Sequence, residues 1–183
     1  MATLIKNKRI VPDTWQLLEP AADGGLPNLP QTGDWIVPFA VWTEQRAQLT
    51  EHKTERQGRN GVLLENTDDA RVLAGDFDKL ALIAVRFPKF TDGRGYSIAR
   101  ILRRAGWKGE LRAVGDVLRD QLFYMTRCGF DAFALRADQD MQTALSAFSD
   151  FTAPYQNAID EGARFGTLSK AASAAQFQSR NPW

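Results

Sequence analysis

The sequence predicts a single α/β domain in which about five mostly parallel strands alternate with helices. Short apolar runs alternate with segments of helical periodicity, and the strand centres lie roughly 20–29 residues apart, close to the ~30 residues of one strand–helix–strand unit. The length of 183 residues fits one domain. Five such units favour an open, doubly wound sheet, and a partial barrel with curled edges is the alternative.

Each predicted strand is a short apolar run bounded by turn residues or charges. The predicted strands are residues 35–39, 61–65, 80–85, 110–114 and 131–135. The predicted helices between and after them are residues 44–52, 66–73, 98–105, 116–129 and 141–148. Periodicity is clearest in the third helix, where Ile98, Ile101, Leu102 and Ala105 repeat at i, i+3, i+4 and i+7.

The chain divides into three parts by composition. Residues 1–34 read as a leader, with a hairpin across Asn7-Lys8 followed by a loop rich in Pro and Gly. Residues 35–153 carry the α/β pattern. Residues 154–183 contain few large apolar side chains, which predicts a weak C-terminal helix and a flexible tail.

Composition excludes several classes of protein. A hydrophobic fraction of 44% and a charged fraction of 25% are typical of a folded domain, and a net charge of +1 predicts no attraction to nucleic acid or membranes. One cysteine and one histidine argue against an iron–sulfur cluster or a zinc site held by this chain. No segment has the pattern of a signal peptide or a membrane span, so we expect a cytoplasmic protein.

Two polar loops follow the third and fourth predicted strands, where ligands bind in open parallel sheets. Positive charge is concentrated there, because residues 86–127 hold ten basic and four acidic side chains. The predicted anion- or cofactor-binding residues are Arg86, Lys89, Asp92, Gly93, Arg94, Gly95, Tyr96, Arg112, Asp116 and Arg119. The pattern assigns no catalytic residue and no metal ligand.

The Gly93-Arg94-Gly95 turn is the centre of this predicted site. Its glycines allow positive φ and close backbone approach, a helix N-terminus presents amide donors, and Arg94 offers a planar fork to an oxyanion. A third glycine of the dinucleotide pattern would fall at Ile98, so a mononucleotide phosphate, sulfate or sulfite fits better. The structural alternative is a tight turn in which Asp92 caps the helix.

Several other polar or reactive residues have plain structural interpretations. Asp116 is expected to be a helix N-cap or to pair with Arg94 or Arg112 across the top of the sheet. Arg103 and Arg104 are expected on exposed helix faces, where they aid solubility. Cys128, at a helix C-terminus without a partner cysteine, is expected to be a small buried apolar residue.

Three segments carry a resemblance to a known family. They are residues 87–97 (FPKFTDGRGYS), 109–122 (GELRAVGDVLRDQL) and 127–133 (RCGFDAF). Together they resemble an uncharacterised family of small bacterial cytoplasmic proteins encoded beside assimilatory sulfite reductase and described as oxidoreductases of sulfite reduction. The resemblance is specific over residues 86–133 and looser over 35–160. The family offers no established catalytic residues.

The resemblance implies a role in sulfur assimilation, towards cysteine biosynthesis. The first hypothesis is an accessory protein that binds sulfite reductase or a small anion. The alternative is an oxidoreductase with a flavin or nicotinamide nucleotide seated over Gly93 to Tyr96, because one cysteine cannot hold an iron–sulfur carrier. Trp183 is a candidate partner-binding residue that would insert into a pocket of the reductase, the alternative being packing on its own domain.

Overall fold

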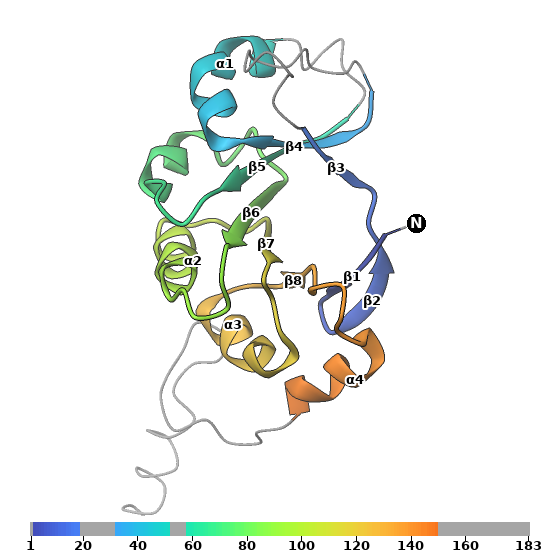
Figure 1. The fold of residues 1–183 in the computed structure, drawn as a ribbon. Coiled ribbons are helices and arrows are strands. Elements are labelled where there is room, and N and C mark those ends of the chain that lie inside the picture. The colour runs from blue at the N-terminus through green and yellow to red at the C-terminus, as the bar shows by residue number, and fades with distance from the viewer. Residues whose placement is uncertain (1, 19–31, 52–57, 150–183) are drawn as a thin grey trace, which may run out of the picture.

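The computed structural model describes residues 2–18, 32–51 and 58–149, and it shows one curled sheet with helices on its convex side (Figure 1). The strands are β1 (Thr3–Lys6), β2 (Arg9–Pro12), β3 (Trp15–Leu17), β4 (Asp34–Pro38), β5 (Asn60–Leu64), β6 (Leu82–Phe87), β7 (Glu110–Gly115) and β8 (Ala132–Phe133). Their order in the sheet is β2-β1-β8-β7-β6-β5-β4-β3. The expectation of about five mostly parallel strands is therefore corrected to a mixed sheet of eight.

The helices cover one face of the sheet. They are α1 (Phe39–Glu51), α2 (Arg94–Arg104), α3 (Leu122–Cys128) and α4 (Met141–Leu145), with 3₁₀ segments η2 (Ala70–Asp76), η3 (Arg119–Gln121) and η4 (Ser146–Ser149). Strands β3 to β8 run parallel and lie side by side in chain order. Because parallel crossovers share one hand, sequential strands place every connecting helix on the same side.

The prediction of a doubly wound sheet is thus wrong, because that fold needs a reversal of strand order and helices on both faces of the sheet. The curled sheet is closer to the alternative of a partial barrel (Figure 1). The main core lies between the convex face and the helices, with residues such as Val85, Leu102 and Met125 fully buried. A second, smaller cluster of Ile36, Leu63, Leu82 and Ala84 lies on the concave face.

The two edge strands of the sheet are consecutive in the chain. β2 pairs antiparallel with β1, which pairs antiparallel with β8, so β2 runs in the direction of the parallel strands. Only Asp13 and Thr14 separate β2 from β3, which pairs with β4 at the other edge. Residues 9–17 are therefore one segment that reaches from one edge of the curl to the other. We call it the joining segment.

The N-terminal hairpin is confirmed. Asn7 and Lys8 form its turn with φ of 49° and 62°, the left-handed conformation that a two-residue hairpin of this kind requires. Ile5 pairs with Phe133, so the hairpin belongs to the main sheet. The predicted C-terminal helix and tail at 154–183, including Trp183, lie outside the described residues.

The structure has a helix or a 3₁₀ segment at each predicted helix position, but the first and last residues often differ from the predicted ones. Ile98 and Leu102 of α2 are buried, as its periodicity predicts, whereas Ala105 at the end of the same stripe is exposed. Gly129 ends α3 in the left-handed conformation with φ of 113°. The predicted helix at 44–52 begins earlier, at Phe39, and the helix predicted at 66–73 is instead the 3₁₀ segment at 70–76. In the described parts of the chain, no helix has the length and apolarity that crossing a membrane would require.

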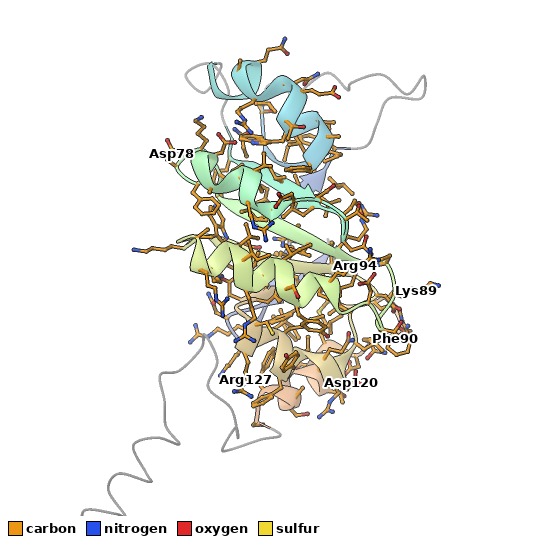
Figure 2. The ribbon with its side chains drawn as sticks, turned by 90° about the vertical axis from the view of Figure 1, so that its left-hand side faces the viewer. Asp78, Lys89, Phe90, Arg94, Asp120 and Arg127 are labelled. Carbon is orange, nitrogen blue, oxygen red and sulfur yellow. The ribbon has the colours of Figure 1, made fainter. Side chains whose placement is uncertain are left out.

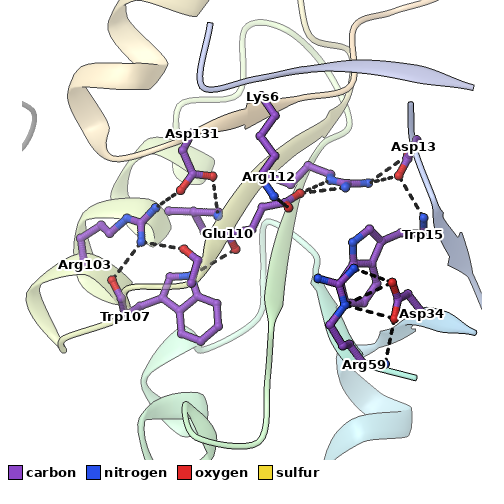
Figure 3. Close-up of polar contacts among 12 residues, drawn as sticks. Lys6, Asp13, Trp15, Asp34, Arg59, Arg103, Trp107, Glu110, Arg112 and Asp131 are labelled. Carbon is purple, nitrogen blue, oxygen red and sulfur yellow. Dashed lines mark hydrogen bonds and ion pairs between the residues drawn. The ribbon is translucent and has the colours of Figure 1, made fainter. Parts of the chain in front are cut away.

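Arg103 is not the solubilising surface residue that we expected. Its side chain is 13% exposed and donates to the carbonyl oxygens of Trp107, Gly129 and Gly109 at 2.8–2.9 Å. A further bond joins Arg103 Nη2 to Asp131 Oδ2 at 2.8 Å (Figure 3). Arg103 thus fastens α2 to the turns that precede β7 and β8. Cys128 is buried, as expected.

Candidate functional site

A cavity of about 290 Å³ opens inside the curl of the sheet. It is lined by Asp13, Trp15, Leu17, Ile36, Leu63, Ala84, Arg86, Arg112, Val114, Gly115 and Ala134. Arg86 and Gly115 lie at the carboxyl ends of β6 and β7, and Ala134 directly follows β8. Barrels of parallel strands bind their ligands at this end. The cavity is therefore the candidate functional site.

Strand alternation makes the walls of the cavity apolar. Successive side chains of a strand point to opposite faces of the sheet. On β6, Ile83 and Val85 pack under the helices, whereas Ala84 and Arg86 face the cavity. The same alternation brings Leu63 of β5 and other apolar side chains of neighbouring strands to the concave face.

A buried ion-pair network bounds the cavity at Arg112, which is 2% exposed. Arg112 Nη1 lies 3.0 and 2.9 Å from the two carboxylate oxygens of Asp13. Arg112 Nε donates to Glu110 Oε1 at 2.8 Å, and Lys6 Nζ donates to Glu110 Oε2 at 2.6 Å (Figure 3). Two carboxylates thus balance the Arg112 guanidinium, and the network ties β7 to β1 and to the joining segment.

Trp15 is held in place as a wall of the cavity by its own neighbours. The Arg59 guanidinium lies over the Trp15 ring, 5.0 Å from its centroid, and Arg59 Nε donates to Asp34 Oδ1 at 3.2 Å (Figure 3). Hydrogen bonding from Arg59 lowers the pKa of Asp34 below its usual value. The Trp15 backbone amide also donates to Asp13 Oδ1 at 3.1 Å.

Arg86 differs from Arg112, the other cation that lines the cavity, because its two Nη groups are available. Its side chain is 40% exposed, and Arg86 Nε lies 3.0 Å from Glu65 Oε1. Within the described parts of the chain, this ion pair is the only polar contact of the guanidinium, so both Nη groups remain without a hydrogen bond. Arg86 is therefore the cavity cation that has donors available to a ligand.

The two polar turns predicted from the sequence lie beside each other. Asp116 Oδ2 accepts from the backbone amide of Phe90 at 2.8 Å, and Gln121 Nε2 donates to Phe90 O at 2.7 Å. Asp116 is not the expected N-cap, because η3 begins three residues later. Its arginine partner is also not the expected Arg94 or Arg112, because Asp116 Oδ1 accepts from Arg136 Nη1 at 2.7 Å. Gly115 has φ of 94°, which favours glycine at this turn.

The Gly93–Gly95 turn has a conformation different from the expected one. Gly93 has φ of −77°, and Gly95 lies in α2, so neither glycine uses the left-handed region. A Cβ at Gly95 would lie 2.5 Å from Phe87 Cζ, which explains this glycine by packing. Arg94 Nε and Nη2 donate to the two oxygens of Asp92 at 3.0 and 2.7 Å, and this bonding lowers the pKa of Asp92. The Arg94 fork therefore already has a partner.

The remaining predicted residues lie around this loop. Figure 2 shows Lys89, Phe90 and Arg94 near the N-terminal end of α2. Tyr96 packs on Phe87 with ring centroids 5.3 Å apart, and burial raises the pKa of Tyr96 to about 12. Arg119 Nη2 donates to Ser146 Oγ at 2.9 Å, which links η3 to η4.

Arg86 and Arg112 are the two residues of the predicted set that line the cavity. For the other eight predicted residues, which do not line the cavity, anion or cofactor binding stays a prediction. Sequence reasoning missed Asp13, Trp15 and Leu17, which belong to the joining segment. The signal was weak, because β3 has only three residues and two of them are exposed.

Comparison with known proteins gives one match. Residues 61–165 match the family model described as bacterial protein of unknown function (DUF934). No curated protein matches, and no solved structure matches. The matched range covers more than half of the chain and contains both cavity arginines. The chain therefore belongs to the DUF934 family.

Proposed function

We propose that this protein is an accessory protein of assimilatory sulfite reduction, within sulfur assimilation and cysteine biosynthesis, that binds a small oxyanion and associates with sulfite reductase. The resemblance of residues 86–133 supports the link to sulfite reduction. The observation that supports oxyanion binding is Arg86 at the carboxyl end of β6, with both Nη groups free of hydrogen bonds within the described residues.

The chemistry of Arg86 suits this role. A guanidinium binds two oxygens of an oxyanion through a planar pair of donors, and it stays charged at any physiological pH. Its competing contact with Glu65 involves two side chains that are each at least 40% exposed. Such exposed pairs contribute little, so a ligand can bind the Nη side of Arg86 without a large loss.

The size of the cavity supports a small ligand. Sites for drug-sized molecules usually measure ~300–1,000 Å³, and this cavity measures about 290 Å³. A flavin or a dinucleotide would need additional surface outside it. The alternative of an oxidoreductase supplying electrons for sulfite reduction predicts a coloured protein with flavin absorbance, or one that binds a nicotinamide nucleotide.

The test is a calorimetric titration with sulfite under nitrogen, together with co-purification from cells grown without cysteine. We expect sulfite binding by the wild type, at least a tenfold loss in Arg86→Ala, and co-purification of sulfite reductase. Arg94→Ala is the matched control, since the Arg94 fork is held by Asp92. Loss of binding in Arg94→Ala alone would place the anion at the surface loop instead. A protein that binds neither sulfite nor the reductase overturns the proposal.

A further inference from the structure

The cavity beyond Arg86 is mainly apolar. Three of its lining residues carry charges, namely Asp13, Arg86 and Arg112. The other eight are apolar side chains or glycine: Trp15, Leu17, Ile36, Leu63, Ala84, Val114, Gly115 and Ala134. An inorganic oxyanion on Arg86 would leave most of these walls without a partner.

The other charged groups of the cavity have no need of a ligand. Asp13 and Arg112 bind each other through two contacts of 2.9–3.0 Å, and Glu110 supplies a second carboxylate to Arg112. A strongly hydrated ion placed deeper than Arg86 would lose water without meeting a charged group that is still unpaired, which is costly. Charge in the ligand is therefore favoured only at the end that faces Arg86.

Apolar atoms are favoured in the rest of the cavity. Removing apolar surface from water stabilises a complex roughly in proportion to the area removed. Leu63 and Ala84 are buried in the protein, and they face the cavity beside Val114 of the next strand. A short aliphatic chain that contacts these walls would displace water that the walls cannot hydrogen-bond.

We infer that the preferred ligand of this cavity is a small organic oxyanion, a carboxylate or sulfonate with a short aliphatic body. Its anionic head binds the Nη groups of Arg86, and its body lies against Leu63, Ala84 and Val114. This inference rests on the oxyanion role of Arg86 in the proposed function, and it adds the class of molecule that carries the anion.

The experiment compares two series of ligands of increasing length by calorimetry. One series is methanesulfonate, propanesulfonate and pentanesulfonate, and the other is acetate, butyrate and hexanoate. Affinity should rise about fourfold for each added methylene until the cavity is filled, with a negative heat-capacity change of binding. The two series distinguish a sulfonate head from a carboxylate head. Equal affinity along both series overturns the inference.

Variants that fill the cavity make the test specific. Ala84→Leu places three more carbons in the cavity and should abolish the rise of affinity with ligand length. Ala134→Leu, at a half-buried lining position, gives the same test if Ala84→Leu does not fold. Ala105→Leu, at an exposed position at the end of α2, is the control and should retain the full dependence. Retained length dependence in a folded cavity-filling variant contradicts the inference.

The outcomes separate this inference from the proposed function. Sulfite binding that depends on Arg86, with a flat length series, leaves the proposed function standing and rejects the organic ligand. A steep length series that depends on Arg86, without sulfite binding or association with the reductase, supports the organic ligand and rejects the link to sulfite reduction.

Discussion

Arg112 and Asp13 are 99 positions apart in the sequence, yet the Arg112 guanidinium holds both carboxylate oxygens of Asp13 within 3.0 Å. Asp13 lies in the two-residue link between β2 and β3, and Arg112 lies in the middle of β7. The pair therefore fastens the joining segment to the centre of the sheet across its concave side.

Replacing Asp13 tests this fastening. Asp13→Ala leaves a buried arginine with only Glu110 as its carboxylate, so we expect a loss of about 3 kcal/mol in the free energy of unfolding. Urea denaturation measures it. Asp138→Ala, which removes an exposed partner of Arg136, is the control and should cost about 1 kcal/mol or less. Equal losses in the two variants would contradict a fastening role for Asp13.

Gly95 and Gly93 form a matched pair for a packing test. An added Cβ at Gly95 would lie 2.5 Å from the buried Phe87 ring, whereas Gly93 has nothing within 4 Å of that position. Gly95→Ala should therefore cost about 1–3 kcal/mol through overpacking. Gly93→Ala should change stability by no more than about 0.5 kcal/mol, since its φ suits alanine. Thermal unfolding of both variants gives the comparison, and two equally stable variants would refute it.

The neighbouring arginines of α2 should differ sharply. Arg103 donates to Gly129, Trp107 and Asp131, among other partners, whereas Arg104 is exposed. Arg103→Ala should cost about 2–3 kcal/mol because a partly buried carboxylate and three carbonyl oxygens lose their donor. Arg104→Ala should stay within about 0.5 kcal/mol of the wild type. Urea denaturation decides, and a marginal effect at Arg103 would count against its structural role.

The raised pKa of Tyr96 predicts that the protein loses stability at alkaline pH. Burial raises the pKa of Tyr96 to about 12 from the usual value of 10.0. The unfolded chain releases the phenolic proton first, so this contribution to stability is fully present below pH 10 and declines as the pH rises to about 12. Ultraviolet titration of phenolate should show a late component that Tyr96→Phe removes. A late component that persists in the variant would belong to another tyrosine.

Local sequence was sufficient to predict those helices and strands whose hydrophobic pattern is complete within a few residues. The strand predicted at 80–85 has buried side chains on both faces of the sheet, so its continuous apolar run is visible without knowing any neighbour. The stripe of Ile98 and Leu102 likewise identifies α2. The hairpin was predictable because its pairing lies within ten residues.

The rest depended on contacts between distant residues. Parallel strands have the same local pattern whichever neighbour they pair with, so strand order and the curl of the sheet could not be read from the runs. The same limit applies to the cavity. The sequence pattern identified Arg86 and Arg112 because they lie in or next to predicted strands. Asp13 and Trp15 come close to them only because the sheet is curled, which no local pattern shows. Arg103 and Arg104 also look alike until Asp131 is placed beside one of them.

The pairing of β1 with β8 has a consequence for biosynthesis. Ile5 is synthesised 128 residues before its partner Phe133. Such distant pairing slows folding, because the chain must close a long loop before the contact forms. The hairpin is thus made before its partner strand and pairs with it late, so the side chains of Leu4 and Ile5, which are buried in the folded protein, stay exposed until translation has passed β8.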